Sequence, residues 1–140
     1  MKQKRILVID GQGGRMGAAF VAQCKAAALP AEIIAIGANS AATAAMLKAG
    51  ADAAATGENP VVVNAPTADI ITGPMGILTA NALLGEITPA MAAAVSESPA
   101  QKLLIPVNRC SVTVVGVTQL PLGEYVRLAV QAAGEQLERE

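Results

Sequence analysis

The chain has 140 residues, of which 53% are hydrophobic and 15% charged, and its formal net charge is -1. That length suits one domain, expected to cover residues 1–140. The sequence has 30 alanines and 13 glycines but only two aromatic residues, so small side chains must fill the core. The absence of histidine excludes Ser-His and Cys-His catalytic pairs. Two aromatic residues also cannot form a base-stacking platform for single-stranded nucleic acid.

The cysteines, the apolar runs and the charges bear on compartment and partners. Cys24 and Cys110 form neither a CxxC motif nor a four-cysteine zinc site. The longest charge-free run, Ile70–Gly85, is too short and polar to span a bilayer, and Ile6–Ile9 is too short for a signal peptide. We therefore expect a cytoplasmic protein with free thiols. Residues 49–101 carry five acidic and no basic side chains, which disfavours nucleic acid and anionic membranes, although ordinary surface carboxylates explain the run equally well.

Apolar runs typical of buried strands alternate with helix-like segments along the chain. In chain order the pattern predicts a strand at Arg5–Ile9, a helix at Gly14–Leu29, a strand at Glu32–Ile36, a helix at Ser40–Lys48 and an alanine-rich strand at Asp52–Thr56. It then predicts a short helix from Asn59 to before Pro66, a strand at Asp69–Thr72, a helix at Ile77–Leu84, a helix from Thr88 to Glu97, strands at Leu103–Val107 and Val112–Val117, and a helix at Leu122–Glu138. Ser40, Asn59 and Thr88 are the expected helix caps.

This alternation predicts an α/β protein with a Rossmann-like, doubly wound and mostly parallel sheet of about six strands. The first two predicted strands begin about 27 residues apart, close to the length of a βαβ unit. Only residues 108–111 separate the last two predicted strands, which is too short for a parallel crossover. Val112–Val117 is therefore expected to be an antiparallel edge strand.

A glycine-rich loop directly follows the first predicted strand and opens the first predicted helix. Its residues are Asp10, Gly11, Gln12, Gly13, Gly14, Arg15, Met16 and Gly17. In this context, we expect Gly11 to make a tight turn, Gly13 and Gly14 to let the backbone approach a ligand, and Gly17 to seat the helix on the strand. The free N–H groups of the helix start would then bind a phosphate. The alternative is that these glycines only pack the helix against the sheet.

The Gly-Arg-Met-Gly part of this loop resembles the corresponding loop of dihydrodipicolinate reductases and the related loop of short-chain dehydrogenases. Over essentially its whole length, the chain also resembles a family of short uncharacterised bacterial proteins, a domain of unknown function with a Rossmann-like sheet. The stretches that carry this resemblance are Val8–Gly14, Ala45–Asp52, Ala55–Asn59, Gly73–Pro74, Leu84–Pro89 and Ile105–Cys110. The resemblance implies a fold and no activity. The Tyr-x-x-x-Lys chemistry of short-chain dehydrogenases is excluded, because Ala129 stands four residues after the sole tyrosine, Tyr125.

The residues that normally select a dinucleotide are missing after the second predicted strand. An Asp or Glu usually holds the adenosine ribose there, whereas this chain continues through Gly37, Asn39 and Ser40. Asn39, Ser40 and Thr43 could bind a ribose or phosphate, and Ser40 is equally well explained as a helix cap. NAD or NADP is therefore a possible cofactor, with similar and weak affinity expected for both, and a smaller phosphorylated ligand should compete well.

Two further segments are expected at the same edge of the sheet, where ligands of open α/β sheets bind. Gly73, Pro74 and Met75 follow the fourth predicted strand, either as part of the site or as a simple turn before a helix. Asn108 and Arg109 follow the fifth, and Arg109 would suit a phosphate or carboxylate unless it is a solvated turn residue. Neither a catalytic role for Cys110 nor a metal at Asp10 finds support in the surrounding sequence.

The preferred hypothesis is therefore a protein that binds a nucleotide or other phosphorylated small molecule, with a small NAD(P)-type oxidoreductase as one form of it. The alternatives are a non-catalytic ligand-binding or regulatory subunit and a structural interaction protein. A homo-oligomer is also expected, because the last predicted helix is apolar on one side and an edge strand offers unpaired backbone groups. The substrate, the reaction and the stoichiometry are left open.

Overall fold

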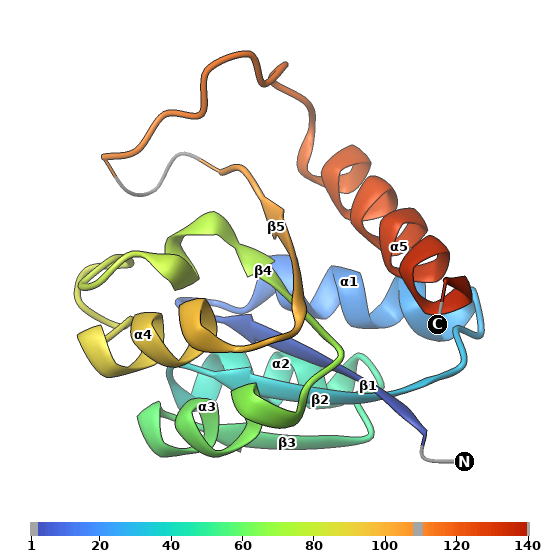
Figure 1. Ribbon diagram of the computed structural model, residues 1–140, viewed down its shortest axis with the longest axis horizontal. Helices are drawn as coiled ribbons and strands as arrows, with labels where there is room; N and C mark the ends of the chain where they lie inside the picture. Colours follow the sequence, from blue (N-terminus) through green and yellow to red (C-terminus); the bar gives the residue numbers. More distant parts are fainter. Residues whose placement is uncertain (1–2, 108–110, 140) are drawn as a thin grey trace.

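Five parallel strands form the centre of the part of the chain that the computed structural model describes, residues 3–107 and 111–139 (Figure 1). The order of the strands in the sheet is β3-β2-β1-β4-β5. The elements in chain order are β1 (Lys4–Asp10), α1 (Arg15–Ala26), β2 (Ala31–Gly37), α2 (Ser40–Lys48), β3 (Ala53–Thr56), α3 (Glu58–Asn64), the 3-10 turn η1 (Ala65–Thr67), β4 (Ile70–Pro74), the 3-10 turn η2 (Met75–Leu78), α4 (Pro89–Glu97), β5 (Gln101–Ile105) and α5 (Leu122–Glu138).

Helices cover both faces of this sheet, which confirms the doubly wound, Rossmann-like arrangement. Successive residues of a strand point to opposite faces, so the continuous apolar run of β1 serves both layers. Ile6 and Val8 pack beneath α1, α2 and α5, whereas Leu7 and Ile9 pack against α3 and α4. All four side chains are fully buried.

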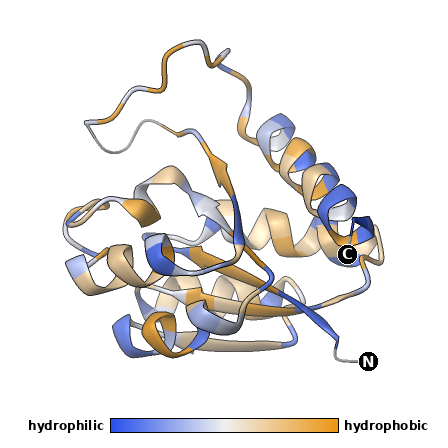
Figure 2. Cartoon of the chain, viewed as in Figure 1, coloured by the Kyte–Doolittle hydropathy of each residue, from blue (hydrophilic) through white to orange (hydrophobic). Residues whose placement is uncertain are grey.

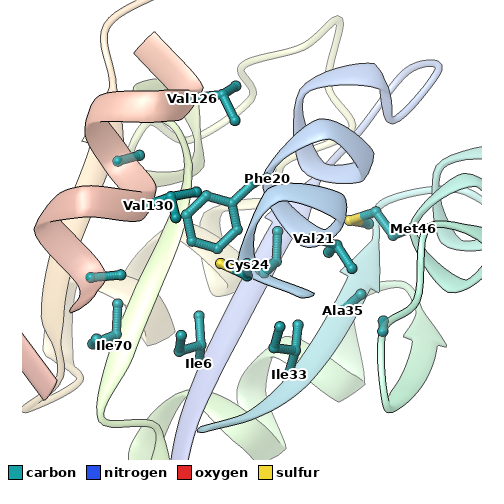
Figure 3. Packing of buried hydrophobic residues seen from close by; sticks show 14 of the residues in the cluster. Ile6, Phe20, Val21, Cys24, Ile33, Ala35, Met46, Ile70, Val126 and Val130 are labelled. Atoms are coloured by element: carbon teal, nitrogen blue, oxygen red, sulfur yellow. The ribbon is translucent and has the colours of Figure 1, made fainter. Parts of the chain in front are cut away.

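Branched aliphatic residues, methionines, alanines and one phenylalanine fill the layer beneath α1 and α5, so the core does not consist of small side chains alone as the composition suggested. Figure 3 shows Phe20 of α1 between the strands and Val130 of α5, with Cys24 one turn further along α1. Burial raises the pKa of the Cys24 thiol to about 12, so this cysteine is a core residue and not a nucleophile.

The connections reverse direction at β1, which places a crevice at one edge of the sheet. α1 and α2 lead from β1 outwards to β2 and β3, and α3 then carries the chain back across to β4 on the other side of β1. The carboxyl ends of β1 and β4 flank this switch point. Ligands of open α/β sheets bind at such a point.

The predicted sixth strand is wrong, and the sheet that the structure describes is parallel throughout. The segment 111–121, called the arm below, leaves the body of the molecule and has no strand partner among the described residues (Figure 1). Its valines are exposed, with 93% of Val115 accessible to solvent. Valine favours a strand where a neighbouring strand supplies packing and backbone hydrogen bonds, and no strand of the described residues lies beside the arm.

The predicted helix at Ile77–Leu84 is also wrong. After η2, the chain runs through successive turns up to Thr88. Asn81, Leu83 and Leu84 take φ angles of +66°, +58° and +57°, and this left-handed backbone cannot continue a right-handed helix. The apolar spacing that suggested a helix instead serves separate contacts, because Leu83 is buried and Leu84 is 99% exposed.

Several boundaries differ from the sequence-based expectation. α1 ends at Ala26 and not at Leu29, and β5 spans Gln101–Ile105 and not Leu103–Val107. The side chain of Asn39, not Ser40, caps α2 by accepting the N–H of Ala42 at 2.8 Å. α3 begins at Glu58 directly after Gly57, so Asn59 is not its cap. β4 extends through Gly73 and Pro74, two residues beyond the predicted strand. Thr88 does cap α4, where it accepts the N–H of Met91 at 3.1 Å.

The last helix is amphipathic, as Figure 2 shows by the alternation of its colours along α5. Its apolar side packs inward through Val126, Val130 and Leu137, so the chain itself covers most of the face that suggested association. None of the helices in residues 3–107 and 111–139 has the length and apolarity required to cross a membrane.

Asp52 lies just before β3 and bonds to β2 and α1. These bonds predict a pH dependence of stability that can be tested. Its carboxylate accepts the N–H of Ile33 at 2.8 Å and pairs with Lys25 at 2.8 Å. The backbone bond first, and Lys25 second, lower the pKa of Asp52 below its ordinary 3.8.

We expect Asp52→Ala to lower the free energy of unfolding by about 1 kcal/mol at pH 7, because the carboxylate is partly exposed and its interactions are screened. The loss should shrink as pH falls below 3.8, since a lowered pKa stabilises the fold only while Asp52 is ionised. Urea unfolding of both proteins between about pH 7 and pH 2 measures this convergence. Lys25→Met should cost less than Asp52→Ala, and an equal or larger cost would show that the backbone bond is not the main contribution.

Self-association stays a prediction, and the exposed valines of the arm are now its basis. Val112, Val114, Val115 and Val117 are each at least 40% exposed. Burying these side chains between copies would remove apolar surface from water. Light scattering at high micromolar concentration should report a mass above 14.0 kDa, and Val115→Asp should shift the distribution towards monomer. A wild-type protein that is monomeric under these conditions contradicts the prediction.

Candidate functional site

A cavity of about 290 Å³ lies at the carboxyl edge of the sheet, over the switch point between β1 and β4. The glycine-rich loop forms one wall, and Pro74, Leu83, Val107 and Leu122 form the rest. The loop residues that line the cavity are Asp10, Gly11, Gln12, Gly13, Gly14, Arg15 and Met16. This volume lies near the lower end of the usual range for small-molecule sites, about 300–1,000 Å³.

The carboxylate of Asp10 holds the loop in shape. One oxygen accepts the N–H of Gly11 at 2.8 Å, and the other accepts the N–H of Gly17 at 2.7 Å. Asp10 is only 6% exposed, and Gly17 lies in the first turn of α1. Asp10 therefore joins the end of β1 to the positive end of the helix dipole, where a carboxylate is favourable. Two N–H groups of the loop are consequently occupied by the protein itself.

Glycine is favoured at each position of the loop for a different physical reason. A Cβ at Gly17 would lie 2.5 Å from the sulfur of Met46 and 3.0 Å from the Cβ of Asp10, which confirms that this glycine allows close helix packing. Gly14 has φ +71°, and a Cβ there would lie 2.7 Å from the Cα of Ala42 in α2. Contrary to the sequence-based interpretation, Gly14 therefore accommodates α2. The tight turn at Gly11 is confirmed by the bond from the N–H of Gly14 to the Gly11 carbonyl, 2.9 Å long.

Gly13 is the glycine that faces open space. The nearest atom to a Cβ built there is the Cγ of Arg15, at 3.9 Å, and Gly13 is exposed. Within residues 3–107 and 111–139, the N–H groups of Gly13, Arg15 and Met16 have no hydrogen-bond partner, and the Arg15 guanidinium has no ion pair. These groups form the part of the loop that could hold an anion, at the N-terminus of a 12-residue helix.

A second carboxylate, that of Glu86, lies on the opposite side of the loop. One Glu86 oxygen accepts the N–H of Gln12 at 2.7 Å, and the other accepts the side-chain amide of Asn39 at 2.5 Å. The same Asn39 amide also donates to the Gln12 carbonyl at 2.9 Å. A Cβ at Gly11 would meet Glu86 at 2.6 Å and Leu83 at 2.9 Å. The chain itself therefore fills the space above Gly11.

The remaining predicted site residues divide into three groups. Asn39 lies beside the loop, and Ser40 is exposed at the start of α2. Gly37 and Gly73 are buried in their strands, whereas Met75 lines a second cavity. Asn108, Arg109 and Cys110 lie outside the described residues.

The second cavity, also about 290 Å³, lies beneath the arm and shares Val107 and Leu122 with the first. Arm residues such as Val114 and Val117 line it. Tyr125 fixes the base of the arm, because its hydroxyl accepts the N–H of Leu120 at 3.1 Å and donates to the Thr118 carbonyl at 2.8 Å.

The sequence interpretation missed four residues of this region: Leu83, Glu86, Val107 and Leu122. The pattern predicts a helix at Leu83, and Glu86 lies in a stretch that carries only the family resemblance. Both follow the loop that they contact by about 75 residues, so no local pattern links them to it. Val107 was assigned to a strand and Leu122 to a helix start, so their shared cavity follows only from tertiary structure. Among the described residues, no group of three acidic or cysteine side chains comes together in a way that could hold a metal ion.

The fold and the loop define a Rossmann-like α/β protein with a cavity at its topological switch point. The chain matches the family described as "Domain of unknown function (DUF3842)" over residues 5–138, and it belongs to that family. The resemblance to a family with a domain of unknown function is thereby confirmed. A comparison with curated proteins finds no match.

The role of Asp10 can be tested by Asp10→Asn. An amide can replace one accepting oxygen, but its NH₂ group would face the N–H of either Gly11 or Gly17. We expect a loss of about 1–3 kcal/mol in the free energy of unfolding, because the site is buried. Chemical denaturation measures it.

Asp69→Asn is the matched control. Asp69 also accepts a backbone N–H, that of Arg5 at 2.8 Å, but its side chain is 32% exposed. Water can replace the lost interaction there, so the control should cost less. Equal losses of unfolding free energy in the two variants would mean that the buried Asp10 bridge stabilises the fold no more than the exposed Asp69 bond does.

Proposed function

We propose that the chain binds a nucleotide or another phosphorylated small molecule at the start of α1. The observation that carries the proposal is an open cavity in which Gly13, Arg15 and Met16 present N–H groups that are unpaired within the described residues. A phosphate there would accept hydrogen bonds from the helix N-terminus and from the Arg15 side chain. Gly13 leaves room for its oxygens, since a Cβ would have no atom nearer than 3.9 Å.

The position of the cavity supports the same proposal. It lies over the switch point of the sheet, where α/β proteins of this architecture bind nucleotides. The wall opposite the loop is apolar, with Leu83, Val107 and Leu122, and would suit the uncharged part of such a ligand. A small oxidoreductase using NAD or NADP is one form of this function, and a non-catalytic sensor or regulatory subunit is another. Turnover of a reduced cofactor distinguishes the two.

Asp10 limits where the phosphate would bind. Its carboxylate accepts the N–H groups of Gly11 and Gly17, so an anion near them would meet a negative charge. The favourable position is therefore next to Gly13 and Arg15. A single helix terminus and one arginine imply weak affinity for phosphate alone, with a dissociation constant in the range of about 1–10 mM.

Titration of the ¹⁵N-labelled protein with inorganic phosphate tests the proposal, since amide spectra detect millimolar binding at single residues. We expect the largest shifts at the amides of Gly13, Arg15 and Met16. Gly13→Val should raise the dissociation constant at least about tenfold, because the added side chain occupies the phosphate position. Its thermal unfolding should stay close to that of the wild type, since among the described residues the nearest atom to the added Cβ is 3.9 Å away.

Arg15→Gln should weaken phosphate binding by about tenfold to a hundredfold through loss of a charge-assisted bond. Lys48→Gln, which removes an exposed cation at the far end of α2, is the control for overall charge and should change the affinity less than about twofold. Unchanged phosphate shifts in folded Gly13→Val protein would contradict the proposed site. A thermal-shift screen with AMP, ATP, NAD, NADP and sugar phosphates then identifies the ligand type.

A further inference from the structure

The carboxyl edge of the sheet has two halves, and within residues 3–107 and 111–139 the cavity lies over one of them. The cavity lies over β1, β4 and the segment after β5, as its lining by Pro74 and Val107 indicates. The other half lies over the ends of β1, β2 and β3. A dinucleotide in a Rossmann fold spans both halves, with one nucleoside on each side of the glycine loop.

The segment 79–88 covers the half next to β2. It runs from η2 to α4 and is drawn in yellow-green beside the glycine loop in Figure 1. Glu86 is bound to the N–H of Gln12 and to Asn39, which follows β2. Leu83 and Glu86 approach so closely that any Cβ on Gly11 would overlap both of them. This explains the glycine at that position without a ligand.

Contacts at both ends and on its buried side hold the segment there. Ile87 is fully buried, and its backbone bonds to both Asn81 and Ala82 close the turn from within. The Thr88 hydroxyl donates to Glu58 of α3 at 2.6 Å and so ties the far end of the segment to the neighbouring helix of the same layer. These contacts maintain left-handed backbone at Leu83, a conformation that is unfavourable for a leucine.

We propose that Leu83 and Glu86 occupy the position of a second nucleoside and thereby restrict the ligand to one compact phosphorylated unit over β1, β4 and β5. This inference rests on the proposed function and specifies its ligand class. Because Leu83 and Glu86 fill this space, the adenosine half of a dinucleotide has no room there. The negative charge of the Glu86 carboxylate also repels a phosphate from the Gln12 amide. The restriction agrees with the modest size of the cavity.

The test compares NAD with nicotinamide mononucleotide, its own half, by titration of the ¹⁵N-labelled full chain. In the wild type, we expect NAD and the mononucleotide to bind with equal affinity, because the adenosine half of NAD makes no contact with the protein. Glu86→Ala and Leu83→Gly should each make NAD bind at least about tenfold more tightly than the mononucleotide. Glycine at position 83 also relieves the left-handed backbone, so at least one of the two variants should fold.

Two controls complete the experiment. Leu84→Ala changes a neighbouring leucine that is 99% exposed. In this variant, the ratio of the affinities for NAD and the mononucleotide should remain that of the wild type. Glu86→Gln keeps the volume without the charge, so it should still exclude the adenosine half.

Several results would overturn the inference while leaving phosphate binding in place. One is a wild-type protein that already binds NAD tenfold more tightly than the mononucleotide. Another is an unchanged ratio of the two affinities in folded Glu86→Ala and Leu83→Gly proteins. A third is a loss of NAD affinity in Glu86→Ala alone. The last would make Glu86 a ribose-binding residue. If neither inorganic phosphate nor either nucleotide shifts the Gly13 and Arg15 amides in any variant, the proposed function and this inference both fail.

Discussion

The carboxylate of Asp10 is the interaction on which the geometry of this protein's loop depends. It is ionisable, nearly buried and bonded at both oxygens to backbone N–H groups, one at the end of β1 and one in the first turn of α1. A buried carboxylate is costly unless such partners compensate for the loss of water. The bridge therefore fixes where α1 starts relative to the sheet, and it leaves Gly13 as the open corner of the turn. The rest of the site is arranged around that corner.

Much of the fold could be predicted from local patterns, because several elements have unambiguous signals. The apolar run of β1 ends at a carboxylate and a glycine, Thr88 with Pro89 marks the start of α4, and α5 has the predicted bounds Leu122–Glu138. Local pattern failed where tertiary contacts decide the backbone. Leu83 and Leu84 have helix-compatible side chains but left-handed φ angles. The valines of the arm have high strand propensity, but no strand in the described part of the chain pairs with them.

The candidate site illustrates the same division between local and distant information. The glycine loop was visible in the sequence because its eight residues are contiguous and lie between a strand and a helix. Glu86 was not, although it bonds to Gln12, because 74 residues separate them. The glycines themselves were only partly informative. Gly14 and Gly17 are required by neighbours on α2 and by Asp10, so a glycine pattern alone does not distinguish helix packing from ligand approach.

The arm also determines how the chain would respond to proteolysis. Residues 111–119 are all exposed, and exposed segments without regular structure are the preferred cutting sites of endoproteases. A cut there would separate α5 from the sheet in sequence but not in space, since Val126, Val130 and Ala133 remain packed in the core with Phe20. The products would be two fragments that stay together through apolar contact alone. The fold could therefore be reconstituted from two separate polypeptides, with the junction in the arm.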